Sequence, residues 1–179
     1  MKRTLEEAIS NRRSYYHINS DSPVEDSEII RIIHEAVRHV PSAFNSQSTR
    51  IVLLLGEHHS KLWEIVKDTL KKMLPEEVFL NTRTKIDGSF ACGYGTVLFF
   101  EDTSVVTQFI QTYPLYSSNF KTWAQHTSAM HQFTVWTMLE DLGFGASLQH
   151  YNPLIDKEVK HTWNLPDEWE LIAQMPFGM

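Results

Sequence analysis

The sequence has little of what would place it in several common protein classes. It holds one cysteine, Cys92, in 179 residues, so no internal disulfide can form and the chain suits a reducing compartment. No apolar run approaches the roughly 20 residues that a membrane-spanning helix needs. The N-terminal segment MKRTLEEAIS also lacks the apolar core of a signal peptide. We therefore expect a soluble, cytoplasmic protein that does not enter membranes.

Basic residues are scarce relative to acidic ones. Lys and Arg number 16 against 22 for Asp and Glu, which gives a formal net charge of -6. A surface of this sign argues against nucleic acid and anionic membranes as partners. Aromatic residues, in contrast, are plentiful, with 5 Trp, 10 Phe and 6 Tyr. Aromatic surface is useful both in a core and around a planar ligand.

The pattern of apolar residues predicts one helix-rich α+β domain over residues 1–179, because no linker, repeat or low-complexity segment divides the chain. A capping-box pattern at Thr4 and Glu7 begins a short helix that ends near Asn11. The same pattern at Ser22, followed by a proline at the first helical position, begins a second helix that Pro41 ends. Apolar spacing predicts further helices at 62–73, 103–111, 120–142 and 155–163.

Three short apolar runs predict the strands of a small central sheet. They lie at 51–55, 96–100 and 170–175, and Pro176 is expected to break the last of them. The order of the strands does not follow from the sequence. Residues 76–94 show little periodicity, so we expect an irregular loop with room for one helical turn. A loop of this length in a compact domain is more often functional than accidental.

The first polar segment of interest follows the first helix. Arg12, Arg13 and Ser14 place two guanidinium groups and a hydroxyl together, a set that suits a phosphate through charge-assisted hydrogen bonds. Two solvated arginines at a helix end are the alternative interpretation.

Three further segments join predicted helices and strands. PSAFNSQSTR carries the side-chain amides of Asn45 and Gln47, which can donate and accept hydrogen bonds at once. The alternative interpretation of this segment is a polar loop that caps a strand. The glycines that begin GFGASLQHYNP allow the backbone to approach a flat ligand closely, and the alternative there is a helix C-cap followed by a turn. Gly93 and Gly95 partly match a dinucleotide fingerprint, but they precede a strand and a third glycine is missing, so we reject that match.

Histidines offer a metal site as a competing interpretation, which the spacing does not favour. His34 and His39, like His126 and His131, are five residues apart and therefore miss the i, i+4 face of a helix. Cys92 has no CxxC partner and no HExxH motif is present. We expect no metal and take Cys92 as a small core residue.

In order and spacing, these segments resemble the FMN-dependent nitroreductase family. The resemblance covers essentially the whole chain, from Arg-Arg-Ser after the first helix and Pro-Ser-Ala-x-Asn-x-Gln before the first strand to Gly-x-Gly-x after the long helix. GYGTVLFFED and GASLQHYNPLI are especially similar to the short branch of the family. Members of that branch have been linked to oxidative-stress and lipid-dependent responses.

The resemblance implies a nitroreductase-like α+β fold with a small, mostly antiparallel sheet surrounded by helices. It also implies a homodimer with the long central helix and two FMN sites at its interface. Arg12, Arg13 and Ser14 would hold the phosphate and ribityl end of FMN, and Tyr16 belongs to the same cofactor-binding set. The isoalloxazine would be approached by Ser42, Ala43, Asn45 and Gln47 of the partner subunit and by Leu148, Gln149 and His150, where a backbone amide reaches N5.

The implied reaction passes a hydride from NADH or NADPH through flavin N5 to an electron-poor small molecule, such as a nitroaromatic or a quinone, in ping-pong order. No residue is expected to act as an acid-base catalyst. A non-catalytic FMN-binding redox sensor or flavin-storage protein is the alternative, and the nicotinamide preference and the physiological acceptor stay open. Related chains continue past the closing strand into a C-terminal arm. We therefore expect a truncated chain or, if it is complete, weaker FMN binding and a smaller dimer interface.

Overall fold

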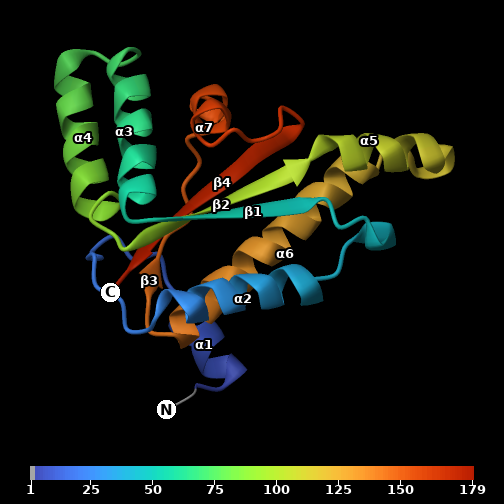
Figure 1. The fold of residues 1–179 in the computed structure, drawn as a ribbon, viewed down its shortest axis with the longest axis horizontal. Helices are drawn as coiled ribbons and strands as arrows, with labels where there is room; N and C mark the ends of the chain where they lie inside the picture. Colours follow the sequence, from blue (N-terminus) through green and yellow to red (C-terminus); the bar gives the residue numbers. More distant parts are fainter. Residues whose placement is uncertain (1–2) are drawn as a thin grey trace.

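A four-stranded antiparallel sheet lies at the centre of the computed structural model, which describes residues 3–179 (Figure 1). Its strands are ordered β1-β2-β4-β3, with bounds of Thr49–Leu55 for β1, Gly95–Asp102 for β2, Trp169–Gly178 for β4 and Gly145–Ala146 for β3. Every residue of β2 is buried, as expected for a strand as apolar as this one when helices cover both faces of the sheet.

Helices surround the sheet on both faces. They are α1 (Leu5–Asn11), α2 (Asp26–His39), α3 (Glu57–Lys71), α4 (Glu76–Ser89), α5 (Thr103–Thr112), α6 (Phe120–Asp141) and α7 (Asp156–Thr162), with short 3-10 turns η1 (Ala43–Asn45) and η2 (Pro114–Tyr116). None of the helices within residues 3–179 has the length and apolar character needed to cross a membrane.

Alternate residues of β2 face opposite cores, as the period of a strand requires. Val97 and Phe99 share a core with buried residues of α2 and α6. Leu98 and Phe100 belong to the core on the other face, which α3, α4 and α7 complete (Figure 1). The buried face of α2 repeats at helical spacing, which explains why it packs as an amphipathic helix.

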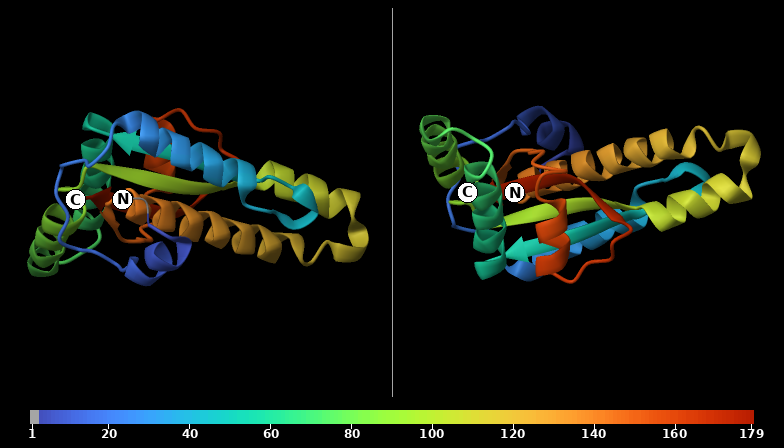
Figure 2. Two further views of the ribbon diagram at one scale, coloured as in Figure 1. Left: turned by 90° about the horizontal axis from the view of Figure 1, so that it is seen from below. Right: turned by 90° about the horizontal axis from the view of Figure 1, so that it is seen from above.

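The molecule is elongated because two helices extend past the sheet. Figure 2 shows α5 and the first half of α6 leaving the sheet as an antiparallel pair, with η1 beside them. The second half of α6 returns beneath the sheet and packs against α1 and α2. Helix α6 therefore links the two ends of the molecule.

Most predicted elements are confirmed. The Thr4 side chain accepts a hydrogen bond from the Glu7 amide, and the Glu7 carboxylate accepts one from the Thr4 amide, so the capping box of α1 is formed. The long helix predicted at 120–142 corresponds to α6, and the three predicted strands correspond to β1, β2 and β4.

The predicted start of the second helix is wrong. Helix α2 begins at Asp26, with Glu25 at its N-cap, three residues later than the Ser22 pattern indicated. The Ser22 hydroxyl instead donates to the Val24 carbonyl at 2.6 Å, which forms a local turn before the helix. Serine side chains commonly compete with the helix in this way.

The irregular loop predicted at 76–94 is also wrong, because most of it is α4. Only Phe79 and Ile86 are buried on this helix, too few for a recognisable apolar stripe. The prediction that Pro176 breaks the last strand is wrong as well, since β4 continues to Gly178. The Pro176 carbonyl still accepts from the Ser147 amide at 3.2 Å, so the proline removes one donor without ending the strand.

Candidate functional site

Arg12 is the best-defined residue of the predicted phosphate-binding segment. It caps the C-terminal end of α1, and its guanidinium carbon lies 4.5 Å from the ring centroid of Trp136 on α6. A cation over an aromatic ring is attracted to the π face and does not need a classical hydrogen bond from its N–H groups. Within residues 3–179, Nε of Arg12 is buried and has no hydrogen-bond partner. A buried unpaired donor costs roughly 1–3 kcal/mol, so this arginine is suited to an acceptor from outside the chain.

The residues after Arg12 lie against the segment that follows α6. Arg13 is exposed and donates through Nη1 to the Arg12 carbonyl at 2.8 Å. Ser14 forms a parallel bridge with Ala146 of β3, and the Tyr15 amide donates to the Ala146 carbonyl at 2.9 Å. The structure thus brings the predicted phosphate-binding residues next to the beginning of the 146–150 segment.

Tyr16 is exposed and has a cation beside it that the sequence did not indicate. Nζ of Lys85 lies 5.8 Å from the Tyr16 ring centroid and 5.9 Å from that of Phe90. Lys85 belongs to α4, in the region that was predicted to be a loop. No sequence signal separated this lysine from the other surface lysines of the chain.

The 147–150 segment presents alternate backbone amides to opposite sides. The Ser147 amide donates to the Pro176 carbonyl, and the Gln149 amide donates to the Gln174 carbonyl at 2.7 Å. Within the described part of the chain, the amides of Leu148 and His150 have no partner. In an extended segment successive amides point in opposite directions, so these two face away from β4. The Gln149 side chain donates to the Ser147 hydroxyl at 3.0 Å.

The second half of the predicted site, the loop 41–47, has an unusual backbone. Phe44, Asn45 and Gln47 have φ values of 55°, 53° and 51°, a region that residues other than glycine rarely adopt. The Ser42 hydroxyl accepts from the Gln47 amide at 3.0 Å, and the Gln47 side-chain amide donates to Asn45 Oδ1 at 3.2 Å. Ala43 lies in η1 at the start of this turn. The side chains of Asn45 and Gln47 are exposed.

A cavity of about 480 Å³ adjoins this loop. Ser42, Asn45 and Gln47 line it together with three residues that the sequence did not assign to the cofactor site, Arg38, Arg50 and His131. His131 is only 4% exposed, and burial lowers its pKa against the opposing effect of its hydrogen bond to the Thr127 carbonyl. Because a carbonyl only accepts, Nδ1 carries a proton, and the lowered pKa favours the neutral form of the ring.

One chain does not bring the two halves of the predicted site together. Phe44 of the loop stacks on Trp123 in the first turn of α6, with 5.9 Å between ring centroids, whereas Arg12 stacks on Trp136. These tryptophans are 13 positions apart on one helix, which corresponds to about 20 Å at 1.5 Å per residue. Figures 1 and 2 show η1 and α1 at separate ends of α6. The two segments can therefore serve one ligand only if a second copy of the chain contributes one of them.

Comparison with known proteins gives matches over almost the whole chain. The Nitroreductase family model matches residues 9–179. Nitroreductase FRM2 of Saccharomyces cerevisiae is 31% identical over 174 residues, which cover 96% of this chain and 86% of the relative. Putative nitroreductase HBN1 of the same yeast is 30% identical, over 98% of this chain and 87% of its own length. The solved structure of nitroreductase CinD from Lactococcus lactis, in complex with nicotinic acid, has a TM-score of 0.89 and 43% identity, and the match covers 98% of this chain and 88% of that one.

Proposed function

Since this chain belongs to the nitroreductase family and is thus an oxidoreductase, we propose that it is an FMN-dependent enzyme. It takes electrons from NADH or NADPH and delivers them to a small electron-poor acceptor, such as a nitroaromatic or a quinone, in a ping-pong reaction. The active form is a homodimer in which residues 3–179 of each subunit act as one cofactor-binding domain. A cytoplasmic location agrees with the single cysteine of the chain.

The residues that follow α1 fit an FMN phosphate. Among the described residues, Arg12 has an enclosed N–H group without an acceptor. Arg13 and Ser14 are exposed beside it, and Lys85 adds a cation near Tyr16. Arginine edges match the oxygens of a phosphate, and each charge-assisted hydrogen bond is stronger than a neutral one. The unpaired Nε of Arg12 is the single observation that carries the assignment of this end of the site.

The remaining residues fit a flat heterocycle with donors and acceptors on its edge. The amides of Leu148 and His150, which have no partner within residues 3–179, are fixed because their neighbours pair with β4. Asn45 and Gln47 present side-chain amides, which both donate and accept. Fixed amide donors also stabilise negative charge that develops on a bound group. When bound, FMN supplies the redox chemistry, because its ring accepts a hydride at N5 from a nicotinamide and then yields it to an acceptor.

The separation of the two segments along α6 supports the proposed homodimer. With Arg12–Ser14 and the 147–150 segment in one subunit, the loop 41–47 has to come from the other. Two exposed apolar side chains of α6, Met130 and Phe133, lie between the two ends and are suited to a subunit interface.

The visible spectrum of the purified protein, followed by titration with FMN, tests the cofactor. Oxidation of NADH or NADPH in the presence of a nitroaromatic or a quinone tests the reaction. We expect flavin bands, saturable FMN binding and turnover with at least one donor and acceptor. A protein that refuses FMN would overturn the proposal. FMN binding without turnover would instead support a flavin-binding sensor or storage protein.

A further inference from the structure

The loop 41–47 needs external support to keep its conformation. Phe44, Asn45 and Gln47 all have positive φ, and an L residue other than glycine holds such a backbone only when its surroundings fix it. On the N-terminal side, the Phe44 ring packs among aromatic rings, including Trp123 and Phe120 of α6. The support on the C-terminal side comes from polar groups at the end of β2.

Glu101 of β2 accepts hydrogen bonds from two consecutive residues at the end of the loop. Its Oε2 lies 2.6 Å from the Ser48 hydroxyl, and its Oε1 lies 2.5 Å from the Thr49 hydroxyl. Ser48 is fully buried, Thr49 is the direct cross-strand partner of Glu101, and Glu101 itself is only 2% exposed. Both carboxylate oxygens are therefore used to fix the residues that follow Gln47.

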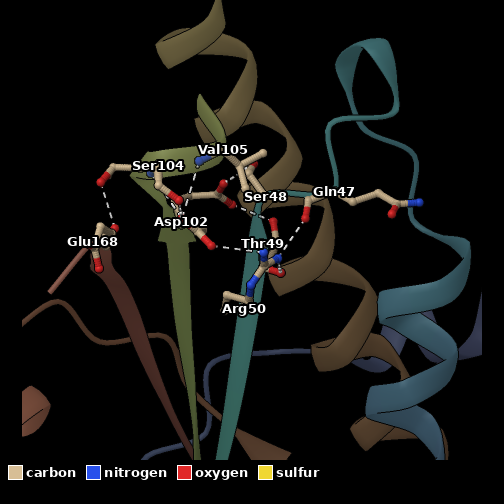
Figure 3. Close-up of polar contacts among 10 residues, drawn as sticks. Gln47, Ser48, Thr49, Arg50, Asp102, Ser104, Val105 and Glu168 are labelled. Carbon is tan, nitrogen blue, oxygen red and sulfur yellow. Dashed lines mark hydrogen bonds and ion pairs between the residues drawn. The ribbon is translucent and has the colours of Figure 1, made fainter. Parts of the chain in front are cut away.

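The next residue of each strand extends this support. Arg50 donates through Nη1 to the carbonyl of Gln47 at 2.8 Å and through Nη2 to Oδ2 of Asp102 at 3.0 Å (Figure 3). The Asp102 amide donates to the Ser48 carbonyl at 2.8 Å. Figure 3 shows these groups of Ser48, Thr49, Arg50 and Asp102 close together, where β1 begins and β2 ends.

A buried glutamate at position 101 is unfavourable for the stability of the fold, so a purely structural role explains it poorly. A buried carboxylate loses its hydration, and an apolar residue of similar size would often stabilise the fold at least as well. Moreover, Glu170 lies directly opposite Glu101 in the β2–β4 pairing, and like charges in that position repel. What the carboxylate provides instead is two acceptors at fixed positions, which select one conformation of Ser48 and Thr49.

We propose that Glu101 is a positioning residue for the cofactor site. By holding Ser48 and Thr49, it keeps the loop 41–47 in the left-handed conformation that presents the side-chain amides of Asn45 and Gln47. This inference rests on the proposed function, in which the loop serves the flavin bound by the partner subunit. Glu101 itself does not touch the cofactor; it acts through the loop.

Glu101→Gln is the direct test, because the side chain keeps its shape but one of its two acceptors becomes a donor. Glu170→Gln is the matched control, since it removes the same charge from the opposing strand residue without touching the loop. The first readout is hydrogen exchange of the Asn45, Ser46 and Gln47 amides in the protein without FMN. We expect about tenfold faster exchange in Glu101→Gln, the loss expected for one charge-assisted hydrogen bond, and no change in Glu170→Gln.

The second readout is the dissociation constant of FMN, measured by quenching of flavin fluorescence well below the unfolding temperature. Glu101→Gln should raise it about tenfold. Thr49→Val and Ser48→Ala each remove one donor from the other side. These two variants should weaken FMN binding in the same direction even if Glu101→Gln folds poorly.

The outcomes separate this inference from the proposed function. If the wild-type protein fails to bind FMN, the proposed function fails, while hydrogen exchange still reports whether Glu101 holds the loop. If the wild type binds FMN and Glu101→Gln lowers only the unfolding temperature, with unchanged loop exchange and FMN affinity, Glu101 is structural and the inference is overturned. An equal effect of Glu170→Gln would overturn it too, because it would assign the effect to net charge.

Discussion

Arg12 stacks on Trp136 with 4.5 Å between the guanidinium carbon and the ring centroid, and this contact fixes the arginine at one end of α6. The stack orients the guanidinium group without consuming its hydrogen bonds. It also gives the site a defined geometry before any ligand binds, since little rotamer entropy remains to be lost. The predictions for this end of the site follow from that arrangement.

Arg12→Lys should weaken FMN binding about tenfold, because an ammonium group neither stacks on Trp136 in the same way nor offers two parallel donors to a phosphate. The dissociation constant from flavin fluorescence measures this effect. Arg31→Lys is the control, since Arg31 is an exposed arginine of α2 that pairs with Glu28 at 2.9 Å. Equal FMN affinity of the Arg12 variant and the wild type would contradict the phosphate assignment.

Asn45→Ala should lower FMN occupancy while leaving the fold of the monomer largely intact. The Asn45 side chain is exposed and makes one polar contact, to the Gln47 amide, so its loss removes little from the folded chain. Flavin content per subunit and the unfolding temperature test the two parts of the prediction. Full flavin content together with unchanged turnover would show that the loop has only a structural role.

The division of the site between subunits can be tested by mixing defective chains. Arg12→Ala and Asn45→Ala should each bind FMN poorly alone. When the two variants are co-expressed, half of the dimers are mixed, and each mixed dimer has one site with both residues intact. About a quarter of all sites should therefore regain flavin. A site built within one chain would regain none.

Much of the fold was predictable because local chemistry and tertiary packing agree there. Helix α6 carries apolar residues around most of its circumference, and β2 is apolar on both faces, so burial on several sides follows from composition. Helix α4 was missed for the opposite reason. It buries only Phe79 and Ile86, so its helical conformation is decided by packing against α3 and not by a periodic stripe.

The residues of the candidate site also fall into two groups, those that the sequence indicated and those that it did not. Arg12, Asn45 and Gln47 could be singled out because the segments that carry them resemble a known family in their order and spacing. The places of Arg38, Lys85 and His131 at the site could not be predicted, because each lies on a helix whose neighbours determine its surroundings. The role of Glu101 was hidden for a further reason: its partners Ser48 and Thr49 are more than 50 residues away, and only the β1–β2 pairing brings them together.

Asp102 joins a helix cap and an ion pair, and two substitutions separate these roles. Its Oδ1 accepts from the Ser104 and Val105 amides at the start of α5, while Oδ2 pairs with Arg50. Asp102→Ala should lower the free energy of unfolding by about 1–2 kcal/mol, as expected for loss of an N-cap with part of an ion pair. Asp102→Asn keeps a capping oxygen and should cost less. Urea denaturation of both variants tests this, and equal destabilisation would show that the charge is the important feature.

His59 should make the stability of the protein depend on pH. Its Nε2 donates to the Ala91 carbonyl, which can only accept, and its Nδ1 lies 2.9 Å from the Thr96 hydroxyl in a buried position. Burial lowers its pKa against the effect of the Ala91 hydrogen bond, whereas in the unfolded chain the pKa is about 6.5. Below that value the unfolded chain binds more protons, so the free energy of unfolding falls as pH drops from 6.5 toward the folded pKa.

His59→Gln should be less stable at about pH 7.5 but lose less stability between about pH 7.5 and 5.5 than the wild type. Thermal unfolding at both pH values measures this slope, and parallel slopes for the two proteins would assign the pH dependence to other groups, such as His131.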